Sequence, residues 1–159
     1  MKFPYPLKTK PPLNFPLKDR TLLVYRSEST WEGFDKNEIS LYQNSQGEFF
    51  LKGRPIREPQ QAFLTENPNP IEEVRVSKRW VCRLLEKLEH ACIPAFPAPQ
   101  VGADGGFIEL EIGGYSGKAH YRWWSVPPQG WEILNRIASE IPQKFYHKSL
   151  LSRLLKKDK

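Results

Sequence analysis

The sequence is poor in the side chains that bind metal ions. Its 159 residues include three histidines, two cysteines and one methionine. His90, His120 and His147 fall in three different predicted elements, and no pair of them has the spacing of metal ligands. We therefore expect no metal site.

Long apolar runs are also absent. No segment approaches the roughly 18–20 apolar residues that a membrane-spanning helix needs. The first residues, MKFPYPLKTKPP, lack the apolar stretch of a secretory signal. We expect a cytoplasmic protein of bacterial type, without a transmembrane segment and without export.

The two cysteines do not suit a disulfide. Cys82 and Cys92 lie on or just after one predicted helix, where ten residues at about 1.5 Å each separate them by about 15 Å. A disulfide needs Cα atoms within about 7 Å. We expect both to be small core residues in a reducing compartment.

Common catalytic and cofactor motifs are missing. The glycine-rich stretch 102–106 precedes a strand instead of opening a helix, so it lacks the context of a phosphate-binding loop. No serine lies in a nucleophile-elbow motif. Glu109 and Glu111 share one strand face about 7 Å apart, but their alternation with apolar residues favours a solvated face. These absences predict a non-enzyme without a cofactor, although an active site assembled from distant residues stays open.

The remaining composition predicts one domain with a proline-rich arm. The chain is 39% apolar and holds 15 prolines, five of them in residues 1–20. Fixed φ angles and missing N–H groups there exclude a helix or a central strand, so we predict an extended arm. Residues 21–143 are expected to form a single α+β domain, and residues 144–159 a basic amphipathic helical tail.

Period-two alternation of apolar residues predicts the strands. Three strands are expected at 21–27, 37–44 and 47–53, with turn residues 44–47 forming a tight hairpin. Residues 71–76 are candidates for a fourth strand because three of them are β-branched. Two further strands are expected on either side of the glycine-rich turn at 113–117, with Ile108, Leu110 and Ile112 alternating along the first.

Helical periodicity predicts two helices and a helical tail. Ser77 is a suitable N-cap for a helix over 78–91 with one apolar stripe. A second helix is expected to start near Pro127-Pro128 and to end at Pro142. The order βββ(β)αββα, followed by a C-terminal helix, predicts a two-layer sandwich. An antiparallel sheet of about five or six strands would have its helices on one face.

Three surfaces could carry recognition. On the last predicted strand, His120, Arg122 and Trp124 lie opposite Ala119, Tyr121 and Trp123, so one set must face away from the helices. Arginine and tryptophan are common in interface hot spots. The competing explanation is that Trp124 is covered by the arm or by Trp131.

The second surface is the connection over residues 27–35, where Trp31 and Phe34 lie among acidic residues. Aromatic residues flanked by acids suit a protein partner, or a loop folded back onto the core. The third is the tail, where leucines share one side and basic residues the other. Such a helix can lie on an anionic membrane, dock into a groove, or pack onto its own domain.

Residues 104–141 contain a DG turn, a strand ending in YRWW and a helix start with PPQGW. This pattern resembles the C-terminal half of small uncharacterised bacterial proteins, some of them immunity-protein-like. The resemblance covers about a quarter of the chain. It implies that Tyr121, Trp123 and Trp131 lock the last hairpin to the last helix, and it transfers no catalytic residue. Immunity proteins neutralise a toxin by direct binding, which is the function the resemblance implies.

The distribution of charge separates the two leading functions. The net charge of +6 comes from the ends, because residues 1–20 carry +4 and residues 144–159 carry +5, which leaves residues 21–143 at −3. We therefore expect a cytoplasmic protein-binding module, with His120, Arg122, Trp124, Trp31 and Phe34 as contact residues. The alternative is a nucleic-acid or anionic-surface binder acting through the basic termini.

Overall fold

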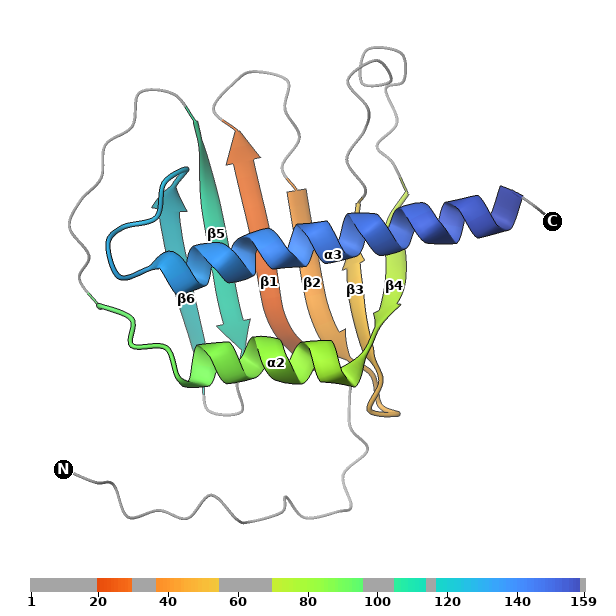
Figure 1. Ribbon diagram of the computed structural model, residues 1–159, viewed down its shortest axis with the longest axis horizontal. Helices are drawn as coiled ribbons and strands as arrows, with labels where there is room; N and C mark the ends of the chain where they lie inside the picture. Colours follow the sequence, from red (N-terminus) through yellow and green to blue (C-terminus); the bar gives the residue numbers. More distant parts are fainter. Residues whose placement is uncertain (1–19, 30–36, 55–69, 96–104, 114–116, 158–159) are drawn as a thin grey trace.

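The computed structural model describes residues 20–29, 37–54, 70–95, 105–113 and 117–157 (Figure 1). The proline-rich arm predicted for the first 20 residues lies outside this range, except for Arg20. The described elements are β1 (Arg20–Ser29), β2 (Asn37–Gln43), β3 (Phe49–Gly53), β4 (Glu72–Val76), α2 (Lys78–Glu89), β5 (Gly106–Gly113), β6 (Lys118–Trp124) and α3 (Glu132–Lys157).

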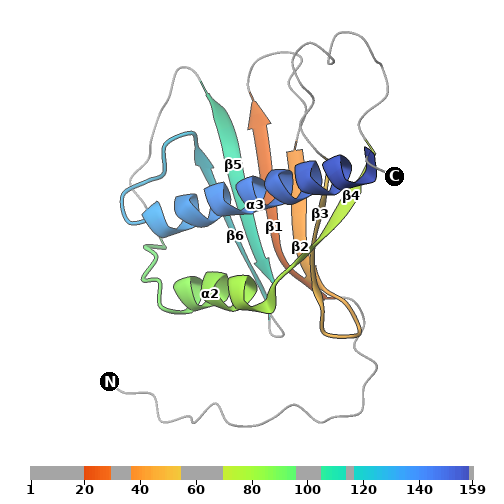
Figure 2. The same ribbon diagram turned by 45° about the vertical axis from the view of Figure 1, so that its right-hand side comes forward.

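The strands form one antiparallel sheet in the order β4-β3-β2-β1-β5-β6. The first four strands are neighbours both in sequence and in space, as consecutive strands usually are. After α2, the chain adds β5 on the free side of β1, and β6 follows as a hairpin partner. Both helices lie on the same face of the sheet (Figures 1 and 2). The predicted two-layer α+β fold is therefore confirmed.

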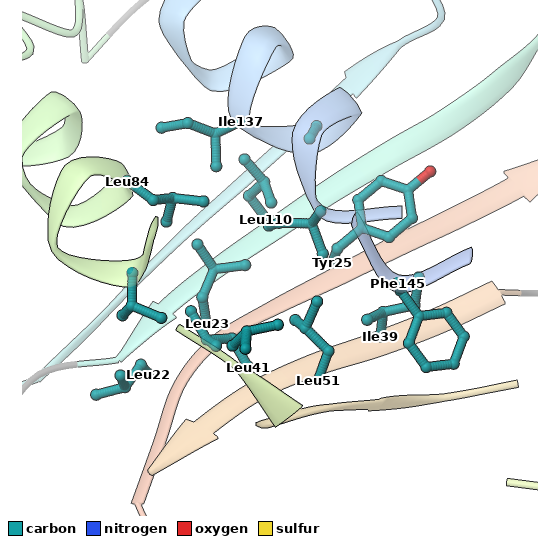
Figure 3. Close-up of a cluster of buried hydrophobic side chains, with 14 of the residues drawn as sticks. Leu22, Leu23, Tyr25, Ile39, Leu41, Leu51, Leu84, Leu110, Ile137 and Phe145 are labelled. Carbon is teal, nitrogen blue, oxygen red and sulfur yellow. The ribbon is translucent and has the colours of Figure 1, made fainter. Parts of the chain in front are cut away.

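Alternation along the strands divides the sheet into a helix-covered face and an open face. Leu23 faces Leu41 and Leu41 faces Leu51 across three neighbouring strands, and all three side chains are fully buried. On the helix side, Leu84 of α2 and Ile137 of α3 pack against this row (Figure 3). Burial of each such side chain stabilises the fold by about 1.5–3 kcal/mol.

The predicted cap of α2 is present, but the prediction that both cysteines are core residues is wrong. The Ser77 hydroxyl accepts a hydrogen bond from the Trp80 amide at 3.3 Å and so satisfies one free N–H of the first turn. Cys82 and Cys92 are both exposed free thiols. Cys82 follows the buried Val81 by one position, which turns it about 100° away from the sheet. Cys92 lies beyond the end of the helix, where helical periodicity no longer applies.

Helix α3 corrects the predicted ending at Pro142. It continues without a break from Glu132 to Lys157, across the predicted junction between domain and tail at residues 143 and 144. An internal proline removes one helical hydrogen bond and costs about 3 kcal/mol. Ile141 and Phe145 flank the proline and are both fully buried. Their burial on one sheet offsets that cost and holds both halves in line.

The far end of α3 is fastened to the strand β4 at the edge of the sheet. Ser149, which is 2% exposed, donates a hydrogen bond to the Glu72 carboxylate. Arg153 binds the other carboxylate oxygen, with Nε at 2.8 Å and an ion pair at 2.7 Å. The helix thus crosses the sheet from β6 to β4 (Figure 1).

Candidate interaction surface

The open face of the sheet carries charges that meet across neighbouring strands. In the strand register, Arg26 of β1 lies between Glu38 of β2 and Glu109 of β5, and Glu109 lies opposite Arg122 of β6. Arg26 Nε lies 2.6 Å from Glu38, and Arg122 Nε lies 3.1 Å from Glu109. Opposite charges on directly facing residues stabilise strand pairing modestly.

Three of the five predicted contact residues gather on this face at β6. His120 Nε2 is 3.4 Å from a Glu109 oxygen, and the Arg122 guanidinium lies 4.0 Å from the centre of the Phe107 ring. Trp124 meets the same ring edge-on, with centroids 4.7 Å apart. Phe107 and Glu109 of β5 therefore organise the predicted residues into one cluster, which we call the β5–β6 cluster.

A second carboxylate beside the cluster binds two cations. Glu111 lies 2.5 Å from Lys118 and 3.4 Å from Arg26. The Lys118 hydrogen bond lowers the pKa of Glu111, with Arg26 contributing in the same direction. The hydrogen bond to Glu38 raises the pKa of Arg26. These ion pairs are present at neutral pH, so the face is charged but locally compensated.

The opposite side of β6 is apolar and fixed by aromatic contacts. The Trp131 ring lies edge-on to Tyr121 and Trp123, with centroid distances of 5.4 and 6.1 Å. Its indole Nε1 donates to the Pro94 carbonyl at 3.0 Å. Trp131 directly precedes α3, so these contacts join the last hairpin to the start of the helix. Trp131 therefore packs on the helix-facing side of β6, whereas Trp124 lies on the open face and is not covered by Trp131.

The other two predicted contact residues, Trp31 and Phe34, lie outside the described residues. The role of their connection as a contact surface stays a prediction. Phe107 was missed because it precedes the alternating stretch that predicts the hairpin. Glu109 and Arg122 carry opposite charges on paired strands. This is the signal that could have extended the predicted contact surface from β6 to β5.

A hollow lies at the other end of the open face. It has a volume of about 610 Å³ and is bordered by acidic and basic side chains of β2, β3 and β4, including Glu38, Lys52 and Glu73. Beside it, the rings of Tyr42 and Phe50 are stacked with centroids 5.5 Å apart. Over the described ranges, no three His, Cys, Asp or Glu side chains group in a way that could hold a metal ion.

Glu109 lines a smaller hollow of about 290 Å³ together with Arg26, Glu38 and Phe107. His120 and Arg122 do not line this hollow. Glu109 therefore does not share this hollow with the two basic side chains that contact it on β6.

Leucines of the predicted tail form a second exposed surface. Leu150, Leu151, Leu154 and Leu155 are 41–70% exposed. The buried Phe145 and Ser149 mark the sheet-facing side of α3, and a helix turns about 100° per residue. The leucines therefore point away from the sheet. None of the described helices is long and apolar enough to cross a bilayer.

No family model and no curated protein matches the sequence.

Proposed function

We propose that this chain is a non-catalytic, cytoplasmic protein-binding module that engages its partner through the β5–β6 cluster. The proposal extends to the immunity type, in which binding itself neutralises a toxin. The resemblance of residues 104–141 to immunity-protein-like sequences supports that extension.

The observation that carries the proposal is the position of Arg122. It lies on a sheet face that neither helix covers, stacked on Phe107 beside Trp124, and its side chain is still 47% exposed. An arginine already held over an aromatic ring loses less entropy when it binds than a free one. Arginine and tryptophan side chains of this kind dominate the binding energy of many protein interfaces.

Arg122→Ala tests the proposal. After the partner has been captured with the wild-type chain and identified, we expect the substitution to weaken its binding by at least tenfold in calorimetric titration. Arg75→Ala is the matched control, because Arg75 is an arginine on the open face of the opposite edge strand and pairs with Glu48. The control should change the affinity by less than twofold. Equal affinity of wild type and Arg122→Ala would disprove the proposal.

A second candidate, binding to an anionic lipid surface, is favoured by the four exposed leucines. Lys78, Arg79 and Arg83 of α2 are exposed on the helical layer, and the first turn of α2 contains no acid. Apolar side chains bordered by basic ones are typical of helices that lie on anionic membranes.

Deleting residues 144–159 cannot test this candidate, because the deletion removes the buried Phe145 and Ser149. We instead expect Leu154→Ser/Leu155→Ser to reduce co-sedimentation with phosphatidylglycerol-containing vesicles more than tenfold. Val126→Ser, at a side chain 64% exposed outside this surface, is the control. If wild type does not sediment with the vesicles at low salt, the candidate fails.

A further inference from the structure

Strand β6 is one of the two edges of the sheet, and its outer side has the features of a pairing template. The strand has seven residues, contains no proline or glycine, and pairs with β5 in one continuous register without a bulge. Natural sheets usually blunt a free edge with prolines, bulges, charged side chains or short strands, because a regular edge accepts another strand. Of these devices β6 has only the charged side chains, Lys118 and Arg122.

The alternation of hydrogen bonds between β5 and β6 shows which β6 residues direct their backbone N–H and C=O groups away from β5. The Ser125 amide donates to the Gly106 carbonyl at 2.9 Å, so these facing residues form a hydrogen-bonded pair in line with the register of β5 and β6. Hydrogen-bonded pairs alternate with non-bonded pairs along an antiparallel ladder. Backbone groups of Ala119, Tyr121 and Trp123 therefore point toward β5. Those of Lys118, His120, Arg122 and Trp124 point outward.

The other edge strand is shorter, and its helix-facing side is bound by α3. β4 has five residues, and its Glu72 is bound by Ser149 and Arg153 of α3. The last turns of α3 cross the sheet at this strand (Figure 1). Within the part of the chain that the structure describes, β6 is thus the longer edge, and its Lys118, His120 and Arg122 side chains form their ion pairs with β5 and with neither helix.

Charge on the open face indicates what an added strand would carry. From β2 toward β6, the charge of the side chains changes sign from strand to strand. It is negative at Glu38 of β2, positive at Arg26 of β1 and negative at Glu109 and Glu111 of β5. β6 continues the series with Lys118, His120 and Arg122 and contributes no acid. These three side chains are 71%, 54% and 47% exposed. An added strand that continued this order would be acidic.

We propose that β6 is a strand-addition site for an extended segment of a protein partner with acidic residues at alternate positions. The acidic side chains lie on the open face against Lys118, His120 and Arg122, while the outward backbone groups of β6 pair with the segment. This inference rests on the proposed protein-binding function and specifies the partner's chemistry. A second copy of β6 fits poorly, because antiparallel pairing about Tyr121 places His120 opposite Arg122 of the other copy.

Amide hydrogen exchange on the ¹⁵N-labelled full chain tests the proposal. The probe is a capped peptide of alternating Glu and Val, eight residues long, at millimolar concentration and low salt. We expect exchange of the outward amides of His120 and Arg122 to slow at least tenfold. A peptide with Lys in place of Glu is the matched control and should leave these amides unchanged. His120→Pro removes one outward N–H without breaking a hydrogen bond to β5, and should abolish the protection.

Equal protection by both peptides, protection elsewhere only, or none at all would overturn the strand-addition site. Protection that grows with protein concentration without peptide would show self-pairing and also overturn it. If the His120→Pro variant fails to fold, Arg122→Gln replaces it, because it leaves the backbone N–H groups in place. We expect Arg122→Gln to weaken binding of the Glu peptide at least threefold. If Arg122→Ala weakens binding of the identified partner while the Glu peptide does not protect the β6 amides from exchange, this inference fails and the protein-binding function stands. If both tests fail, neither holds.

Discussion

Phe145→Ala is expected to reduce the free energy of unfolding by about 3–5 kcal/mol. The Phe145 ring is fully buried against the sheet three residues after Pro142, in the half of α3 that the sequence assigns to a separate tail. Truncation to alanine removes its transfer free energy and leaves a cavity that the rigid sheet cannot fill. Chemical denaturation followed by circular dichroism measures the loss.

Leu155→Ala is the matched control on the same helix. Leu155 is 70% exposed on the side away from the sheet, so its truncation should change the free energy of unfolding by less than about 0.5 kcal/mol. A Phe145→Ala loss as small as that of Leu155→Ala would contradict the continuous packing of α3. The predicted junction between residues 143 and 144 would then mark a real domain boundary.

Trp131→Ala should destabilise the fold by a similar amount, about 3–5 kcal/mol. Trp131 is 6% exposed and joins three segments: its ring contacts Tyr121 and Trp123 on β6, its indole binds the Pro94 carbonyl after α2, and its backbone precedes α3. The loss combines a large buried aromatic surface with one hydrogen bond. Thermal unfolding monitored by near-ultraviolet circular dichroism measures it.

Trp131→Phe separates packing from hydrogen bonding. Phenylalanine keeps an aromatic ring against Tyr121 and Trp123 but leaves the Pro94 carbonyl without its donor. We expect a loss of about 1–3 kcal/mol, clearly less than for alanine. If the alanine variant is as stable as wild type, the three rings do not hold the hairpin to the helix.

Local patterns were sufficient to predict the hairpins. Residues 44–47 supply a turn in which the Asn44 side chain accepts from the Gln46 and Glu48 amides, and Gly47 adopts a φ of 80°. Both interactions depend only on residues within four positions. For that reason the turn, the flanking strands and the Ser77 cap are predictable from sequence alone.

Predictions failed where distant contacts decide the structure. Pro142 is a strong local signal for a helix end, but burial of Ile141 and Phe145 on the same sheet outweighs it. Likewise, Cys82 is apolar and central in its helix, yet Val81 and Leu84 set the side that faces the sheet. The direction in which a helix presents its residues follows from the packing partner, which one sequence does not specify.

The candidate site was only half predictable for a related reason. Alternation along β6 separates His120, Arg122 and Trp124 from the buried residues, and the structure places these three on the open face. Alternation cannot show that Phe107 lies under Arg122, because that contact depends on the exact register between β5 and β6. Register is a property of two strands together.

The fastening of α3 to β4 has a consequence for the order of folding. The strand pairs from β1 to β4 join near neighbours in the sequence and can form early. The contacts of Glu72 with Ser149 and Arg153 form later, because these residues lie 77 and 81 positions further along the chain. Contacts of such long sequence separation form slowly, because the intervening chain must first be ordered. The first-made half of the sheet is therefore fastened to the last-made helix, and during synthesis the contacts of Glu72 with α3 cannot be completed until residue 153 has emerged.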